Sequence, residues 1–285
     1  MESFDYIVVG AGSAGCVVAN RLSEDPNTKV LLLEAGPEDK SPFIHVPFGI
    51  IGLIKEGKHN WGYNTAPQDK LGGRSLYWPR GKTLGGSSSI NAMVYIRGHH
   101  KDYDEWAELG NEGWDWESVK PIFKAHERNE VMKGPLHGRD GELNVTNVRD
   151  QNPLSAVFID ACEELGYPRN NDFNGDSQYG AGPYQVTQKD GQRFSSAKAF
   201  LNPVKQRANL TIKTGALVRK VVIENQKAVG VEYQVGDGAV TTSRVNKEVV
   251  LSGGAINSPH LLMLPGVGVE KHLKADSNTH LRAHE

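Results

Sequence analysis

The residues best suited to chemistry lie near the start of the chain, where three glycines and an acid have the spacing of a dinucleotide-binding motif. Gly10, Gly12 and Gly15 form a Gly-x-Gly-x-x-Gly pattern directly after a short apolar run, and Glu34 ends a second apolar run. The first glycine permits a tight turn, the second lets a pyrophosphate approach the backbone, and the third lets helix and strand pack closely. A carboxylate about 20 residues beyond the motif can accept the ribose hydroxyl hydrogens and would repel a 2′-phosphate, which disfavours NADP.

The order of these residues predicts a strand, a turn and then a helix whose first residues include Ser13 and Ala14. Unpaired N–H groups and the positive end of the helix dipole would face the phosphates there. An ordinary glycine-rich turn is the alternative interpretation, and a glycine motif alone would not exclude it. The motif, both flanking strands and the spaced acid together favour nucleotide binding.

A second block, residues 80–98, combines small and polar residues before an apolar run. Gly85 and Gly86 precede three serines, beginning at Ser87. Small side chains let a flat ligand lie against the backbone, while amides and hydroxyls can bond its polar edge. The charges of Arg80 and Lys82 could favour a nearby diphosphate. From composition alone, a plain loop is the more common explanation of such a run.

The elements around these blocks indicate an α/β fold. Residues 37–80 lack regular periodicity and form a long connection of the kind that often covers a ligand. We expect Trp61, Tyr63, Tyr77 and Trp78 to bury their rings there. The strands expected after residue 206 are 210–213, 217–223, 229–235 and 240–245, followed by a buried strand from 248 that ends in two glycines, with a hairpin turn at Asp237-Gly238. A helix is expected over residues 258–264, with Pro259 in its first turn.

Composition excludes several classes of protein. The chain has 285 residues and a formal net charge of −2, so no basic excess points to nucleic acid. No apolar run approaches the ~20 residues that span a bilayer, and the immediate first strand leaves no room for a signal peptide. The two cysteines, Cys16 and Cys162, are interpreted as small hydrophobes rather than a disulfide. These features predict a cytoplasmic protein.

A metal site is one interpretation of His99, His100 and Asp102, whose side chains can all ligate a metal. Adjacent histidines lack the i, i+4 helical spacing of familiar zinc sites. A solvated loop is therefore expected here, and no metal.

These blocks together resemble the glucose–methanol–choline (GMC) oxidoreductases, with the choline dehydrogenase and aliphatic alcohol dehydrogenase branch looking most similar. The resemblance runs from Phe4 to about Leu264 and includes residues 254–262, which look like the second signature of that family. The segments at 61–63, 67–68 and 193–197 also match the habits of the family.

The resemblance implies FAD as the cofactor. Glu34 would hold the adenosine ribose, Val218 would meet the adenine through its backbone, and Gly85, Gly86, Ser87, Asn91 and Ala92 would line the flavin. Some members link the flavin covalently through a histidine; Ile90 stands at that position here, so non-covalent FAD is expected. The full set of expected cofactor-binding residues is Gly10, Gly12, Ser13, Ala14, Gly15, Glu34, Ala35, Arg80, Gly85, Gly86, Ser87, Asn91, Ala92, Met93, Val94, Val218, Gly253 and Gly254.

The implied fold is a Rossmann-like FAD-binding domain, a parallel sheet with a β-meander, plus part of an α+β substrate domain. The expected boundaries are 1–140 and 206–268 for the FAD-binding domain, with a flavin-covering loop over about 37–100, and 141–205 for the substrate domain. Residues 269–285 are expected to be a divergent, disordered tail, and its His272, His280 and His284 are given no role.

The implied reaction is oxidation of an alcohol, such as choline, to a carbonyl compound, with hydride transfer to flavin N5. The family's catalytic histidine and its histidine or asparagine partner would lie in a C-terminal half that has no counterpart here, so no catalytic residue is assigned and a truncated, impaired member is expected. A non-catalytic FAD-binding module that needs a second chain, and an NAD-dependent dehydrogenase, remain alternatives. An oligomer or complementing C-terminal chain would cover an exposed sheet edge. A quinone acceptor would place the protein at the membrane periphery.

Overall fold

The computed structural model describes residues 2–270 and residue 273, and these residues form two compact units. Of the described residues, the first unit contains those up to 44, 48–90 and those from 196 onward, and the second contains 45–47 and 91–195. The stretch 91–140, assigned by the sequence to the cofactor domain, thus lies in the second unit. The expected tail falls almost wholly on residues outside the description, and so do His272, His280 and His284.

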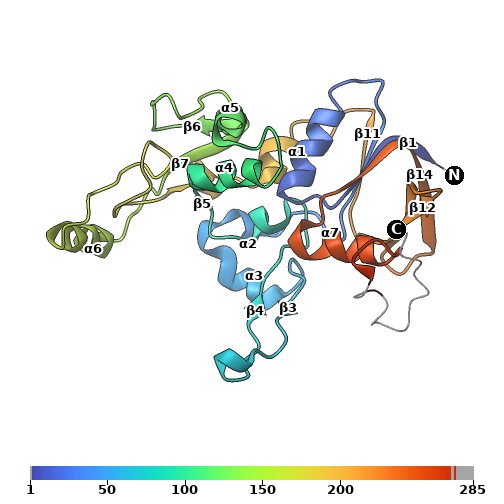
Figure 1. Ribbon diagram of the computed structural model, residues 1–285, viewed down its shortest axis with the longest axis horizontal. Coiled ribbons are helices and arrows are strands. Elements are labelled where there is room, and N and C mark those ends of the chain that lie inside the picture. Colours follow the sequence, from blue (N-terminus) through green and yellow to red (C-terminus); the bar gives the residue numbers. More distant parts are fainter. Residues whose placement is uncertain (1, 271–272, 274–285) are drawn as a thin grey trace. The chain divides into compact units, whose positions relative to one another are not determined.

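The first unit is built on a six-stranded sheet with the order β11-β2-β1-β14-β13-β12 (Figure 1). Its strands are β1 (Ser3–Val9), β2 (Val30–Leu33), β11 (Leu210–Lys213), β12 (Ala216–Glu224), β13 (Lys227–Val235) and β14 (Val240–Leu251). The first four strands in that order are parallel, and β12, β13 and β14 form an antiparallel meander. β2 is a continuous apolar run buried along its whole length, as expected for a parallel strand covered on both faces.

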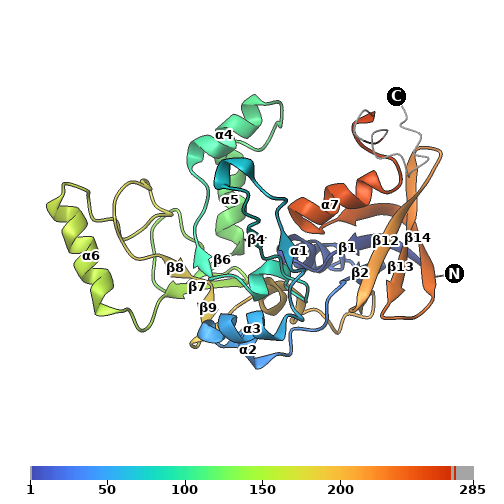
Figure 2. The same cartoon turned by 90° about the horizontal axis from the view of Figure 1, so that it is seen from below.

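Two helices complete this layer structure. α1 (Ser13–Leu22) packs against β1 and β2, and α7 (Gly254–Met263) packs against β12, beside the meander in Figure 2. Leu261 of α7 joins a buried apolar cluster with residues from four strands, including Ile7, Leu31 and Val231, and partly buried residues of β14 pack against it. Burying this face of the sheet is the main driving force for the unit.

Three expectations about the first unit were wrong in detail. α7 begins at Gly254 rather than residue 258, so Pro259 lies inside the helix, where its missing N–H removes one backbone bond. The connection after residue 37 contains α2 (Pro42–His45), α3 (Ile50–Glu56) and the hairpin β3 (Tyr63–Asn64) and β4 (Tyr77–Trp78). Tyr77 and Trp78 are about half exposed, so the expected burial of their rings is wrong.

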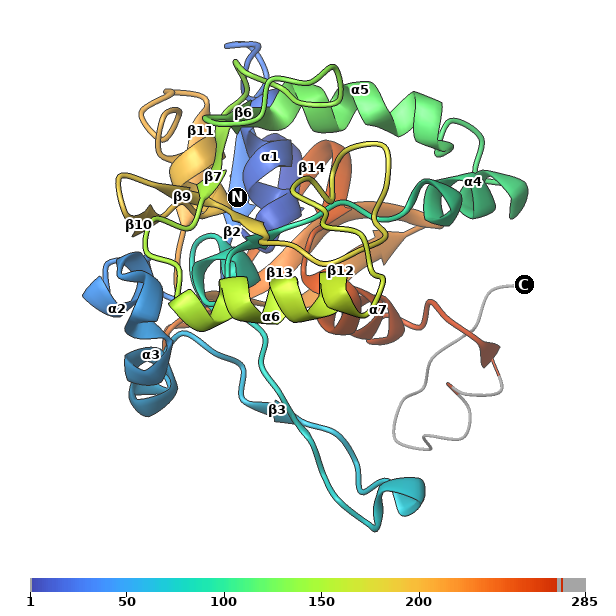
Figure 3. The ribbon, with the colours of Figure 1, turned by 90° about the vertical axis from the view of Figure 1, so that its left-hand side faces the viewer.

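The second unit contains a four-stranded sheet with the order β5-β8-β7-β6, of which β6 and β7 are labelled in shades of green in Figure 3. Its elements are β5 (Val94–Tyr95), α4 (His100–Glu108), α5 (Trp116–His126), β6 (Glu127–Asn129), β7 (Leu143–Asn147), α6 (Pro153–Glu164), β8 (Gln185–Val186), β9 (Gln188–Lys189) and β10 (Gln192–Arg193). The sequence pattern predicts a short strand over residues 142–148 and a helix near residues 153–165, and β7 and α6 confirm both. α4 was not expected, and the solvated loop predicted at residues 99–102 is wrong: His99 caps this helix by accepting a bond from the Lys101 amide.

Candidate cofactor-binding site

The glycine-rich turn between β1 and α1 is held by backbone packing at two of its three glycines. Gly10 has a φ of +95°, and a Cβ there would lie 2.6 Å from the Ser252 carbonyl oxygen. A Cβ on Gly15 would lie 1.9 Å from the Gly10 oxygen. Gly12 differs, because the protein atoms nearest to its Cβ position are 3.9 and 4.0 Å away. The fold therefore requires glycine at the first and third positions, whereas a Cβ at Gly12 would make only ordinary van der Waals contacts.

The N-terminus of α1 is open to an anion. Gly12 is its N-cap, and no side chain caps the helix. Ser13 and Ala14, the first two residues of the helix, are exposed. Their backbone amides and the positive end of the helix dipole suit a phosphate group, as the motif predicts.

Glu34 lies directly after β2 and beside this turn. Its Oε2 accepts a hydrogen bond from the Ala11 amide and its Oε1 accepts one from the Gly36 amide, each at 2.8 Å. The residue is only 5% exposed. Burial raises the pKa of Glu34, while the two amide bonds and the charge of Lys82 oppose that shift. The turn thus orients a buried carboxylate that retains acceptor lone pairs for a hydroxyl group.

The second glycine-rich block packs against the first. The Gly85 amide donates to the Ala11 oxygen at 2.8 Å, and a Cβ on Gly86 would lie 2.7 Å from the Gly12 Cα. Gly86 opens a short 3-10 turn, Gly86–Ser89, and Ser87 is exposed at its start. Two segments separated by about 70 residues therefore meet backbone to backbone, and glycine at position 86 is what allows that approach.

Other predicted residues of the first unit fall at the same end of the sheet. The Ala216 amide, at the start of β12, donates to the Glu34 backbone oxygen at 2.8 Å, which brings the strand of Val218 beside the acid. The Ser252 amide donates to the Val9 oxygen at 2.8 Å. This bond brings the residues after β14, which include Gly253, the N-cap of α7, and Gly254, close to the end of β1. Ala35 follows Glu34 directly and is half-buried.

The Arg80 side chain bonds and packs within its own segment. Its Nη1 donates to the Pro79 oxygen at 2.7 Å, and its guanidinium carbon lies 5.3 Å from the ring centre of Trp78. Lys82 lies over the ring of Trp61 at 4.6 Å and is the cation whose charge reaches Glu34. Of the two predicted cations, Lys82 is therefore the one with an electrostatic link to the site.

The remaining predicted residues, Asn91, Ala92, Met93 and Val94, belong to the second unit. Asn91, Ala92 and Val94 are exposed, whereas Met93 is buried and has a φ of +63°. The Asn91 side-chain oxygen accepts bonds from the Met93 amide at 3.0 Å and from Arg193 Nη1 at 2.9 Å. The sequence analysis noted residues 193–197 only as a segment that matches the family and gave Arg193 no role of its own.

Comparison with known proteins identifies the family. The model of the GMC oxidoreductase N-terminal domain matches residues 4–283, beyond the limit near Leu264 that the motifs suggested. The chain belongs to the GMC oxidoreductase family. It is 55% identical over 273 residues to an alcohol dehydrogenase [acceptor] of Pseudomonas putida, covering 95% of this chain and 50% of that protein. It is 47% identical to the mitochondrial choline dehydrogenase of Mus musculus, covering 94% and 46%.

Solved structures agree with this membership. An FAD-dependent oxidoreductase from Chaetomium thermophilum matches with a TM-score of 0.89 and 31% identity, covering 95% of this chain and 49% of that one. The chain spans about half the length of the curated relatives it matches. The fold expected from the sequence, a parallel-rich α/β sheet of the FAD-binding type, is thereby confirmed.

This GMC chain also contains a buried ionic network that the sequence did not reveal. Glu127 accepts bonds from Arg97 Nη2 at 2.6 Å and lies 3.0 Å from His137 Nδ1, while His137 Nε2 lies 2.8 Å from Asp172. Burial opposes a charge on His137, but its two carboxylate partners outweigh burial and raise its pKa. Hydrogen bonds from His137, Asn129 and Gly138 lower the pKa of Glu127 despite its burial. These groups bond one another and hold the second unit together.

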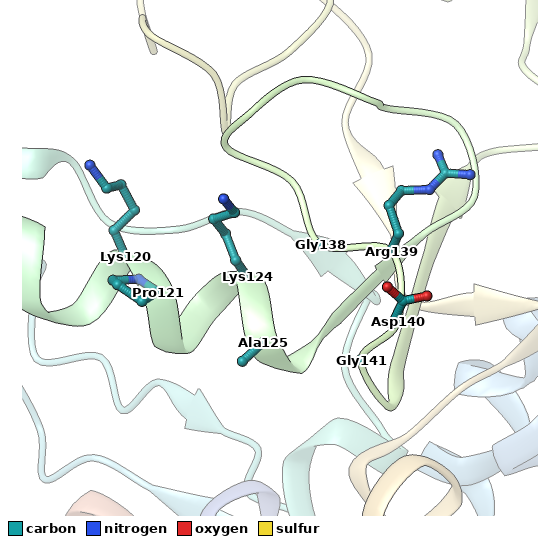
Figure 4. Close-up of a pocket in the computed structure, with 8 residues that line it drawn as sticks. All are labelled: Lys120, Pro121, Lys124, Ala125, Gly138, Arg139, Asp140 and Gly141. Carbon is teal, nitrogen blue, oxygen red and sulfur yellow. The ribbon is translucent and has the colours of Figure 1, made fainter.

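A surface cavity of about 440 Å³ in the second unit lies beside α5 (Figure 4). Its charged lining residues are Lys120, Lys124, Arg139 and Asp140, and Lys120 is already paired with Glu117 at 2.6 Å. None of the predicted cofactor residues lines it. Among the described residues, no cluster of histidine, cysteine, aspartate and glutamate could hold a metal ion, and no helix is long and apolar enough to cross a membrane.

Proposed function

We propose that this GMC chain binds FAD, with the diphosphate at the N-terminus of α1 and the adenosine ribose at Glu34. The observation that supports this most strongly is the buried Glu34 carboxylate, which accepts hydrogen bonds from the Ala11 and Gly36 amides next to the N-terminus of α1, where no side chain caps the helix. A ribose diol donates two hydrogens, and an ionised carboxylate accepts them. The start of β12, next to Glu34, would place the Val218 backbone near the adenine.

The binding proposed here is non-covalent. Ile90 occupies the position at which some members carry the flavin-linked histidine, and an isoleucine side chain cannot form such a bond. Cys16 is close to the turn, but burial raises the pKa of its thiol to about 12, and its Sγ donates to the Ala11 oxygen. The thiol is therefore protonated and held inside the fold, where it forms no bond to a ligand.

We propose that the reaction is oxidation of a primary alcohol, with choline as one candidate, to a carbonyl compound. The names of the relatives in Pseudomonas putida and Mus musculus support this substrate class. When bound, FAD accepts a hydride from the alcohol carbon. The described residues supply the cofactor pocket, and we assign no catalytic base among them. The alternative is a flavin-binding module without catalysis, and adding an alcohol to the FAD-loaded protein tests it. Flavin that is not reduced would favour this alternative.

We also propose that a further strand completes the sheet at β14. Residues 240–244 of β14 pair with β13, and residues 244–251 pair with β1 on the other side. Among the described residues, no strand pairs with the β13-facing edge of residues 246–251. Such an edge favours pairing with another segment or chain.

The cytoplasmic location stays a prediction.

The experiment that tests the function is a titration of the chain with FAD, followed by flavin fluorescence, with NADH and NADPH in parallel. Saturable binding of FAD and much weaker binding of both nicotinamides would support the proposal. Preferential binding of NADH would replace it with the dehydrogenase alternative. Anaerobic choline and primary alcohols added to the FAD-loaded protein then show whether its flavin is reduced.

A further inference from the structure

Residues 91–93, which follow the glycine-serine block, have an unusual backbone conformation at Met93, and the β9–β10 hairpin with the residue before it contacts them. Met93 is a buried, non-glycine residue with a φ of +63°. The Thr187 amide donates to the Met93 oxygen at 2.9 Å, and Gln188 Nε2 lies 3.6 Å from Met93 Sδ. A left-handed methionine persists only where its surroundings determine it, and such outliers are common at ligand sites.

Arg193 lies on β10, the second strand of this hairpin, and it fixes the side chain of Asn91, two residues before Met93. The residue is 1% exposed, and its Nη1 donates to Asn91 Oδ1 at 2.9 Å. Burial lowers the pKa of Arg193 to about 10, so the guanidinium remains charged at neutral pH. A guanidinium can only donate, and the Met93 amide donates to the same Oδ1 at 3.0 Å.

These two donors determine which way the Asn91 carboxamide points. With Oδ1 engaged by Arg193 and the Met93 amide, the Nδ2 group is the part of the amide that remains available to a ligand. Asn91 is exposed, although the arginine that holds it is buried. The side chain therefore offers hydrogen-bond donors and no acceptor. A flavin ring carries carbonyl oxygens and ring nitrogens that accept such bonds.

We propose that Arg193 is a positioning residue that locks the Asn91 carboxamide so that its NH₂ group donates to an acceptor atom of the bound flavin. This inference rests on the proposed function, because it requires FAD to bind at the segment containing Asn91. Arg193 acts through Asn91 and does not itself touch the cofactor.

The test uses the full chain with three substitutions and one control. Asn91→Asp keeps an acceptor for Arg193 but removes the outward donor, so we expect about a tenfold higher Kd for FAD and a changed visible circular dichroism of the bound flavin. Arg193→Met releases the amide and should move both readouts in the same direction, and Arg193→Lys should restore part of the loss. Arg207→Met, a half-buried arginine that bonds the Asn20 oxygen and Ser23, should move neither readout.

A double-variant comparison separates positioning from simple support of the fold. In an Asn91→Ala background, Arg193→Met should cause no further loss of FAD affinity, because its route to the flavin is gone. An equal loss in both backgrounds, or unchanged affinity and dichroism in Asn91→Asp and Arg193→Met, would overturn the inference. If Arg193→Met does not fold, Arg193→Lys in the two backgrounds provides the same comparison. Failure of the wild-type chain to bind FAD would instead overturn the proposed function.

Discussion

Replacing Glu34 by alanine has two separable consequences. In the unliganded protein it strands the Ala11 and Gly36 amides, each of which now bonds a carboxylate oxygen at 2.8 Å. An unsatisfied buried donor costs about 1–3 kcal/mol, so thermal stability should fall. In the complex it also removes the acceptor for the ribose hydroxyls, and FAD affinity should fall by a further ~1–3 kcal/mol, which is roughly 5- to 150-fold in Kd.

The assay is an FAD titration followed by flavin fluorescence, with thermal unfolding measured on the same samples. Glu38→Ala is the matched control, since Glu38 is exposed and pairs with Lys40 at 2.9 Å. Glu34→Gln keeps one acceptor oxygen and should lie between the wild type and Glu34→Ala. A folded Glu34→Ala protein with wild-type FAD affinity would refute the assignment of Glu34 to the ribose.

The pH dependence of binding gives a second view of the same carboxylate. Burial raises the folded-state pKa of Glu34 above its ordinary value of 4.5. Its contribution to stability is thus fully present below about pH 4.5 and is lost as the pH rises through the raised value. Ribose hydroxyls favour the ionised form, so FAD affinity should increase with pH over that same window and level off above it. Affinity that declines with pH there would contradict this account.

Three further predictions concern the rest of the chain. Arg97→Met should destabilise the protein by about 3–5 kcal/mol in urea unfolding, because it leaves the buried Glu127 without the arginine that pairs with it. The double variant Arg97→Met with Glu127→Leu should recover much of this loss. Losses that simply add in the double variant would argue against the pairing. The raised pKa of His137 stabilises the fold fully below about pH 6.5, and this stability should be lost as the pH rises through the folded value; His137→Asn should flatten that part of the stability profile, and an unaltered profile would exclude His137. In the native protein a thiol reagent should modify the partly exposed Cys162 and reach Cys16 only on unfolding, so prompt labelling of both would show that the β1–α1 turn opens.

The parts of the fold that sequence predicted are those fixed by local sterics and periodicity. Gly10 and Gly15 are required by backbone contacts at the turn they create, and the buried β2 reads as an unbroken apolar run that ends at Glu34. β11 appears at residues 210–213 as expected, and the antiparallel β13–β14 pair confirms the hairpin at Asp237-Gly238.

The parts that sequence missed depend on partners distant in the chain or on unusual local chemistry. Asn91 and Arg193 are about 100 residues apart, and neither local sequence predicts that their side chains bond. The Arg97–Glu127–His137 network is long-range in the same way. α4 was not predicted because its N-cap is a histidine, His99, and this position is usually taken by serine, threonine, aspartate or asparagine.

The most direct test of the central claim is the visible absorbance spectrum of the purified chain reconstituted with FAD and freed of excess cofactor, before and after acid precipitation. Non-covalent binding at the β1–α1 turn predicts a flavin spectrum in the native protein and FAD released into the supernatant, with Glu34→Ala retaining less of it. A native protein with no retained flavin, or flavin that stays with the precipitate, would contradict the account.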